Sequence, residues 1–278
     1  MNNLFLSSIY RVPDAVMGDS FPWTLPLFRD LKRLEFSSRV TFLVGENGSG
    51  KSTLLEGLAV GTRAIAAGSG QVDQDETLWA AHEFARAFRF VRRNRPQRTM
   101  FMRSEDVLGY TLTVAKQRKD EAIALAGGFK ALDAAREAEE HEEAADIAKP
   151  SIAQAGPRLK RRLGRKYGLD PVNRSHGETF LGLLAARLVP KGLYLLDEPE
   201  TPLSPSRVIA LLALLKDRAG MGCQFVVATH SPILMAVPES QILLFEQGNI
   251  RPISYNDVEH VRITKAFLSD PQKFLRHL

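Results

Sequence analysis

One stretch of nine residues limits the fold of this chain more than any other. It fits the pattern G-x-x-x-x-G-K-[ST], and its residues are Gly45, Glu46, Asn47, Gly48, Ser49, Gly50, Lys51, Ser52 and Thr53. Residues 39–44 before it are apolar and β-branched and predict a buried strand, while Thr53 to Leu58 predict the start of a helix. A glycine-rich loop in this position lets backbone N–H groups approach an anion closely, because no Cβ intervenes. The stretch therefore predicts a loop that cradles the phosphates of a nucleotide, rather than an ordinary glycine turn.

The end of this loop and a second stretch predict the chemistry at the phosphates. Lys51 is expected to reach the β- and γ-phosphates, and the Ser52 hydroxyl is expected to ligate Mg²⁺. Residues 193–198 are four apolar residues followed by two carboxylates, as at the end of a buried parallel strand. Asp197 would hold Mg²⁺, directly or through water, and Glu198 would polarise the attacking water. Together the two stretches predict a site for a nucleotide and Mg²⁺.

Two further stretches narrow the type of nucleotide site. Ser175, His176, Gly177 and Glu178 directly precede an amphipathic pattern, and their alternative role is a capping box at the start of a helix. His230 follows a predicted strand at 224–228, where a neutral imidazole could hydrogen-bond a γ-phosphate. A lone histidine at a strand end is usually structural, so the functional role depends on the order of all four stretches.

Predicted strands alternate with predicted helices along most of the chain. We expect strands at 4–12, 34–44, 99–103, 193–196 and 224–228, a hairpin at 242–253, and helices at 76–93, 178–189, 208–215 and from 258 onward. Residues 105–172 are richer in Ala, Lys and Glu, and they predict a helical subdomain inserted within a single domain of residues 1–278. This alternation predicts an α/β core with a mostly parallel sheet.

Composition and charge limit the setting of the protein. The chain has one cysteine, Cys223, which suits a reducing compartment, and its start does not read as a secretory signal. No apolar stretch is long enough to cross a bilayer, so we expect a cytoplasmic protein without a transmembrane segment. The net charge is +5, with arginine-rich segments at 86–98 and 158–166 and an acidic block at 137–146. The basic segments indicate either a nucleic-acid surface or solvated helix faces that pair with the acidic block.

The complete set of motifs resembles that of the ABC-type ATPase superfamily. Walker A and Walker B sequences, a signature-like stretch at 175–178, a D-loop-like stretch at 201–205 and a switch His230 occur in the order of that family. More narrowly, residues 195–200, 203–205, 228–232 and 260–268 are similar to the bacterial predicted-ATPase group of AAA-family or ABC-like ATPases. The resemblance implies a P-loop NTPase fold of ABC type, with an inserted helical subdomain that ends at the signature.

The resemblance also implies how the site would work. ATP would be sandwiched in a homodimer, with Ser175, Gly177 and Glu178 of one copy contacting the nucleotide held by the loop of the other. Glu198 would act as the general base, and His230 would bind the γ-phosphate. Glu105 stands where the family has a glutamine, and it is a candidate metal or water contact. His176 and Ser204 replace a signature glycine and a D-loop aspartate, so the interface contacts in this chain differ from the family pattern.

Several functions fit these expectations. The first is a Mg²⁺-dependent ATPase that couples nucleotide-driven dimerisation to an unknown protein partner, with DNA metabolism or defence as candidate settings. The alternatives are the ATP-binding subunit of a membrane transporter and an ATP-gated scaffold that does not hydrolyse. Because the sequence ends soon after His230, we expect no fused nuclease domain. Tyr10, Trp23 and Phe28 are candidates for stacking on adenine, with core packing as the alternative for each.

Overall fold

The computed structural model describes residues 4–66, 70–72, 78–103 and 176–276. The chain divides into two compact units, one of residues 1–107 and 187–278 and the other of residues 108–186. The second unit contributes only its last residues to the described chain, in helix α6 (His176–Arg187), where the sequence predicts a helix at 178–189. The predicted insertion at 105–172, Glu105 and Ser175 all lie outside the described residues, so those expectations stay predictions.

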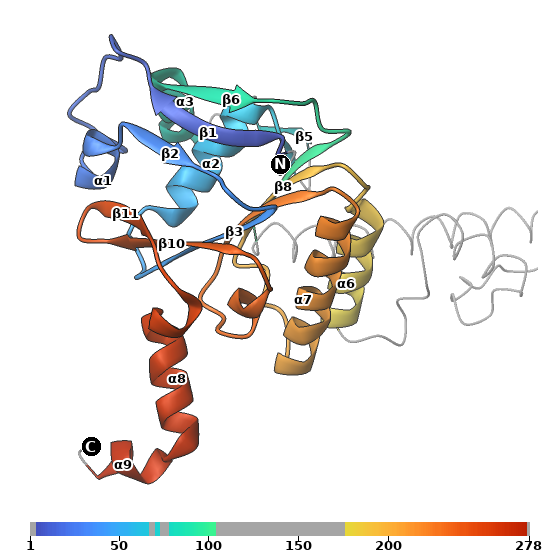
Figure 1. Cartoon of the computed structure of the whole chain (residues 1–278). Coiled ribbons are helices and arrows are strands. Elements are labelled where there is room, and N and C mark those ends of the chain that lie inside the picture. The colour runs from blue at the N-terminus through green and yellow to red at the C-terminus, as the bar shows by residue number, and fades with distance from the viewer. Residues whose placement is uncertain (1–3, 67–69, 73–77, 104–175, 277–278) are drawn as a thin grey trace, which may run out of the picture. The chain divides into compact units, whose positions relative to one another are not determined.

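The first unit is built on one large sheet whose strand order is β11-β10-β3-β9-β8-β7-β4-β5. The six strands from β10 to β4 pair in parallel, and only the outermost strands β11 and β5 are antiparallel to their neighbours. This confirms the predicted α/β fold with a mostly parallel sheet (Figure 1). The strands are β3 (Val40–Gly45), β4 (Ile65–Ala66), β5 (Gly70–Gln71), β7 (Thr99–Arg103), β8 (Leu193–Asp197), β9 (Gln224–Ala228), β10 (Gln241–Glu246) and β11 (Asn249–Pro252).

The central strands are apolar along their whole length because both faces of the sheet are covered. Every residue of β3 and β9 is buried, as are the first four residues of β8. Helix α2 (Lys51–Thr62) covers one face and α7 (Pro205–Gly220) lies on the other, while α3 (Trp79–Ala87) packs on α2 (Figure 1). A Cβ at Gly57 would lie 2.3 Å from the Phe84 ring, so glycine lets α3 pack closely on α2.

Short helical elements lie between β9 and β10 and after β11. They are the 3₁₀ turns η4 (Leu234–Ala236) and η5 (Tyr255–Asp257), and helices α8 (Glu259–Ser269) and α9 (Pro271–Leu275). The helix expected from 258 onward is broken at Asp270, between α8 and α9, and Pro271 begins the second helix. No helix among the described residues has both the length and the hydropathy needed to cross a bilayer.

A small antiparallel sheet, β2-β1-β6, corrects two predictions. Its strands are β1 (Leu6–Arg11), β2 (Arg33–Glu35) and β6 (Phe88–Arg92), and the short helix α1 (Pro26–Asp30) precedes β2. The strand expected at 34–44 is therefore two strands in two different sheets. The helix expected at 76–93 is wrong beyond Ala87, because Phe88 to Arg92 pair with β1 as a strand.

Candidate functional site

The glycine loop connects the carboxyl end of β3 to the start of α2. Gly45 has φ 147°, and a Cβ there would lie 2.4 Å from the Phe245 carbonyl oxygen, so only glycine fits. Gly48 and Gly50 also have positive φ, 77° and 99°. The helix begins at Lys51, two residues before the predicted start at Thr53. The backbone N–H groups in the first turn of α2 therefore come from residues of the loop motif. They have no intrahelical acceptor and can bind an anion.

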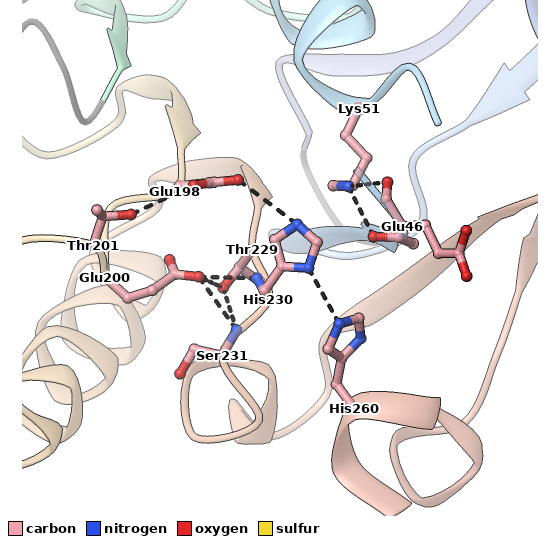
Figure 2. Close-up of polar contacts among 10 residues, drawn as sticks. Glu46, Lys51, Glu198, Glu200, Thr201, Thr229, His230, Ser231 and His260 are labelled. Atoms are coloured by element: carbon pink, nitrogen blue, oxygen red, sulfur yellow. Dashed lines mark hydrogen bonds and ion pairs between the residues drawn. The ribbon is translucent and has the colours of Figure 1, made fainter. Parts of the chain in front are cut away.

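Lys51 lies across this loop with its ammonium group enclosed. The residue is 5% exposed, and Nζ donates hydrogen bonds to the carbonyl oxygens of Gly45 at 2.8 Å and Glu46 at 2.7 Å (Figure 2). Burial lowers the pKa of Lys51, while the nearby carboxylates of Glu198 and Asp197 act in the opposite direction. The loop cation and the carboxylates at the end of β8 are therefore close enough to interact.

Asp197 and Ser52 come together at the carboxyl ends of the strands. The Ser52 hydroxyl lies close enough to the Asp197 carboxylate to lower its pKa as a hydrogen-bond donor, and Oδ1 of this carboxylate is buried without a hydrogen-bond partner among the described residues. Burial raises the pKa of Asp197 to about 6; the Ser52 hydrogen bond opposes this shift, and the charges of Glu198 and Glu56 add to it. An unpartnered oxygen of this kind is suited to a cation.

These oxygens fit Mg²⁺, which prefers hard oxygen ligands. Among the described residues there is no group of three or more His, Cys, Asp or Glu side chains that could hold a metal. That finding is consistent with Mg²⁺, because the ion is usually held by one or two protein oxygens together with the phosphates of its substrate. Ser52 and Asp197 would hold the ion, and the bound ion would neutralise negative charge on the phosphate oxygens.

Glu198 and His230 face each other beside the loop. Glu198 Oε1 lies 3.6 Å from His230 Nε2, the Glu198 side chain is 41% exposed, and its Oε2 accepts from the Thr201 hydroxyl at 3.4 Å. Burial lowers the pKa of His230, Lys51 and His260 act in the same direction, and Glu198 opposes them. His230 is therefore mostly neutral at pH 7, as the sequence predicts for a phosphate contact.

Glu200 is a site residue that the motif analysis missed. Its Oε1 accepts hydrogen bonds from the Thr229 hydroxyl, from the His230 N–H at 2.9 Å and from the Ser231 N–H at 3.2 Å (Figure 2). Burial raises the pKa of Glu200, against the effect of the hydrogen bonds it accepts. The residue ties the end of β8 to the segment that carries His230. Its signals in the sequence are its place in the family-like stretch 195–200 and its position as the third acid, after Asp197 and Glu198.

His260, at the start of α8, is the second residue that the sequence did not reveal as part of the site. Its Nε2 lies 3.3 Å from Nδ1 of His230. It also lines a cleft of about 770 Å³ whose wall includes Glu46 to Ser49 of the loop and the turn of the β10–β11 hairpin. This cleft opens directly beside the phosphate loop.

The remaining predicted site residues are the three candidates for stacking on adenine and the signature residues. Trp23 and Phe28 are 2% and 0% exposed, so both are core residues and cannot stack on a base. Tyr10 is 40% exposed and lies on β1 of the small sheet. Gly177 and Glu178 lie in the first turn of α6 in the second unit, and their contact with a nucleotide, like that of Ser175, stays a prediction.

Comparison with known proteins gives matches to two family models and to two import ATP-binding proteins. Residues 25–149 match a model described as "AAA domain", and residues 178–236 match one described as "AAA domain, putative AbiEii toxin, Type IV TA system". The chain is 26% identical to the hemin import ATP-binding protein HmuV of Rhodococcus jostii over 225 residues, which cover 76% of this chain and 63% of that protein. It is also 26% identical to the amino-acid import ATP-binding protein YxeO of Bacillus subtilis, described as probable, over 212 residues, covering 76% of each.

Among solved structures, the SMC head domain from Thermotoga maritima is similar with a TM-score of 0.46 and 17% identity, covering 90% of this chain and all of that one. By its fold and its loop, the molecule is a P-loop nucleotide-binding protein. The two AAA-domain models and the two import ATP-binding proteins support a narrower assignment, to the ABC-type P-loop ATPase superfamily.

Proposed function

We propose that this chain is a Mg²⁺-dependent ATPase whose site is completed when ATP brings two copies together. The observation that carries the proposal is the meeting of the loop, with Lys51 and Ser52, and the end of β8, with Asp197 and Glu198. We propose that the γ-phosphate binds among these four residues, which come from two separate parts of the sequence, with His230 beside them.

The position of each residue indicates its role in hydrolysis. Glu198 is open to solvent and can take a proton from a water molecule while that water attacks the γ-phosphorus. The bond to the bridging oxygen of ADP then breaks, and the charge that gathers on the phosphate oxygens faces Lys51 and the N–H groups of α2. His230, held by the Glu200 network, would donate a hydrogen bond to the γ-phosphate. The presence of both Glu198 and His230 favours hydrolysis over a non-hydrolysing scaffold.

The site is proposed to close across a homodimer. Glu46, Asn47 and Gly48 are exposed, so the outer side of the loop is open to a second molecule. Superfamily membership supports a closure in which Ser175, Gly177 and Glu178 of that second molecule cover the phosphates. A cytoplasmic setting and an unknown protein partner belong to the same proposal. The alternative of a transporter subunit is favoured by the names of the two relatives, both import ATP-binding proteins.

A nucleic-acid partner has its own support in an arginine cleft, formed by Arg63, Arg92, Arg93, Arg95 and Arg98. These arginines line a cavity of about 780 Å³, and no acidic side chain is among its described lining residues. The cavity includes Thr99, the first residue of β7, and so lies where the parallel strands begin, whereas the phosphate loop lies where they end. A phosphodiester backbone has the charge and the hydrogen-bond acceptors to fill such a cleft without competing with ATP.

Phosphate release from ATP by the purified full chain tests the proposed activity. We expect Mg²⁺-dependent turnover, reduced by about 100-fold or more in Glu198→Gln because the base is lost while ATP binding is kept. In Lys51→Ala, ATP should bind about 10- to 100-fold more weakly, since hydrogen bonds to charged groups contribute about 1.5–3 kcal/mol. Lys216→Ala, on the exposed side of α7, is the matched control and should leave both quantities unchanged. Normal ATP affinity in Lys51→Ala would contradict the assigned loop.

A further inference from the structure

Each ring nitrogen of His230 faces a different titratable side chain. Nδ1 lies 3.3 Å from Nε2 of His260, with the rings edge to face and their centroids 5.0 Å apart. Nε2 lies 3.6 Å from the Glu198 carboxylate, and this nitrogen is buried without a hydrogen bond in the described part of the chain. Figure 2 shows His230 between Glu198 and His260. The two neighbours therefore influence which nitrogen carries the proton.

The position of His260 is fixed by the segment that contains it. His260 is the second residue of α8, and Val258 and Val261 on either side are 1% and 4% exposed. The Tyr255 hydroxyl just before α8 donates to the Pro232 carbonyl oxygen at 3.1 Å, which ties this segment to the one that follows His230. The two imidazoles thus meet because two anchored segments bring them together.

A neutral imidazole has one donor and one acceptor, so the contacts of His230 select between its tautomers. If Nδ1 carried the proton, the bare Nε2 would face the Glu198 carboxylate, and two acceptors would oppose each other. If His260 donates from its Nε2, the proton of His230 lies on Nε2 and faces Glu198. Only the second arrangement gives every close pair a donor and an acceptor.

We propose that His260 is a positioning residue that donates its Nε2–H to Nδ1 of His230 and holds His230 in the tautomer protonated on Nε2. The other charged groups that act on His230 are Glu198 at the end of β8 and Lys51 at the start of α2, and neither hydrogen-bonds to Nδ1 in the described residues. The functional consequence rests on the proposed ATPase activity: His230 would present an N–H to the γ-phosphate.

The tautomer itself is measured without ATP by nuclear magnetic resonance of the full chain labelled with ¹⁵N-histidine, at a pH where the imidazoles are neutral. His230→Gln identifies the signals. We expect His230 to be protonated on Nε2 and unprotonated on Nδ1. In His260→Phe, which keeps a ring and removes the donor, the signals should shift toward a mixture of both tautomers. His260→Gln, whose amide N–H extends nearly as far as Nε2, should restore the wild-type pattern. Protonation of His230 on Nδ1, or an unchanged pattern in His260→Phe, would overturn the proposal.

Turnover gives a second, separate readout. We expect His260→Phe to lower kcat by about 10- to 100-fold, a typical effect of removing an orienting partner, with KM for ATP changed much less and with recovery in His260→Gln. If the wild-type chain shows no turnover, the proposed function fails, while the tautomer measurement still decides the role of His260. A kcat in His260→Phe equal to wild type would contradict the proposed consequence for the γ-phosphate.

Discussion

The Asp197 carboxylate is buried, although its proposed role as a Mg²⁺ ligand requires the charged form. Burial raises the pKa of Asp197 to about 6, above the value of about 4 expected in the unfolded chain. Between these values the folded state binds more protons than the unfolded state. Stability from this residue is therefore complete below about pH 4 and is lost as the pH rises through about 6. At neutral pH the free protein holds a charge that a bound cation would compensate.

Asp197→Asn should therefore stabilise the metal-free protein near pH 8 by about 1–3 kcal/mol and have little effect near pH 3, where the carboxyl group is protonated in both states. Urea unfolding at both pH values, with a chelator present, measures the difference. Mg²⁺ should stabilise the wild type at pH 8 and have no effect on Asp197→Asn. A variant that is less stable than the wild type at both pH values would show that the carboxylate charge is not destabilising.

Residues within continuous motifs could be predicted, while residues recruited by tertiary contact could not. Lys51, Ser52, Asp197, Glu198 and His230 each belong to a short pattern, and the structure brings them to one place. His260 reaches the site through a contact with a residue 30 positions away, and Glu200 does the same through Thr229 and its neighbours. A single sequence contains no local signal of such contacts.

At the scale of elements, the Glu200 network joins strand β8 to the segment after β9. Replacing Glu200 with alanine leaves the Thr229 hydroxyl and the His230 N–H without this acceptor, while the Ser231 N–H keeps the Thr229 hydroxyl oxygen, so we expect a loss of about 2–3 kcal/mol of unfolding free energy. Glu200→Gln keeps an acceptor oxygen and should lose about 1 kcal/mol or less. Urea unfolding of both variants measures this, and equal losses would indicate that the negative charge, not the acceptor, matters.

The boundary between α3 and β6 shows where the hydrophobic pattern misleads. Phe84, Ala85 and Phe88 are at helical spacing, yet the helix ends at Ala87. Phe88 pairs with Arg11 and Phe90 pairs with Ile9 of β1, while the Phe88 ring stacks on Phe84 with centroids 4.4 Å apart. The same apolar residue thus satisfies the helix pattern and the strand pattern, and pairing with a distant strand decides between them. The glycine loop and the buried central strands had no such ambiguity.

At the scale of the whole molecule, the arginine cleft predicts salt-dependent binding of DNA. We expect the double variant Arg93→Ala/Arg95→Ala to bind a labelled DNA oligonucleotide about 10-fold more weakly, and the slope of log affinity against log salt to fall by about 2. Fluorescence anisotropy between about 50 and 200 mM salt measures both. The control Lys216→Ala/Lys265→Ala removes the same amount of positive charge outside the cleft. If the control weakens DNA binding as much as the cleft variant does, DNA is attracted only by the overall charge of the protein.

The most direct test of the account is the mass in solution of Glu198→Gln with and without Mg²⁺ and ATP, measured by light scattering. Because this variant should bind ATP without hydrolysing it, the closed state should accumulate, and we predict about twice the mass of one chain with ATP and the mass of one chain without it. Lys51→Ala/Glu198→Gln should stay at the mass of one chain under both conditions. If Glu198→Gln binds ATP and still shows the mass of one chain, a site completed by a second copy is contradicted.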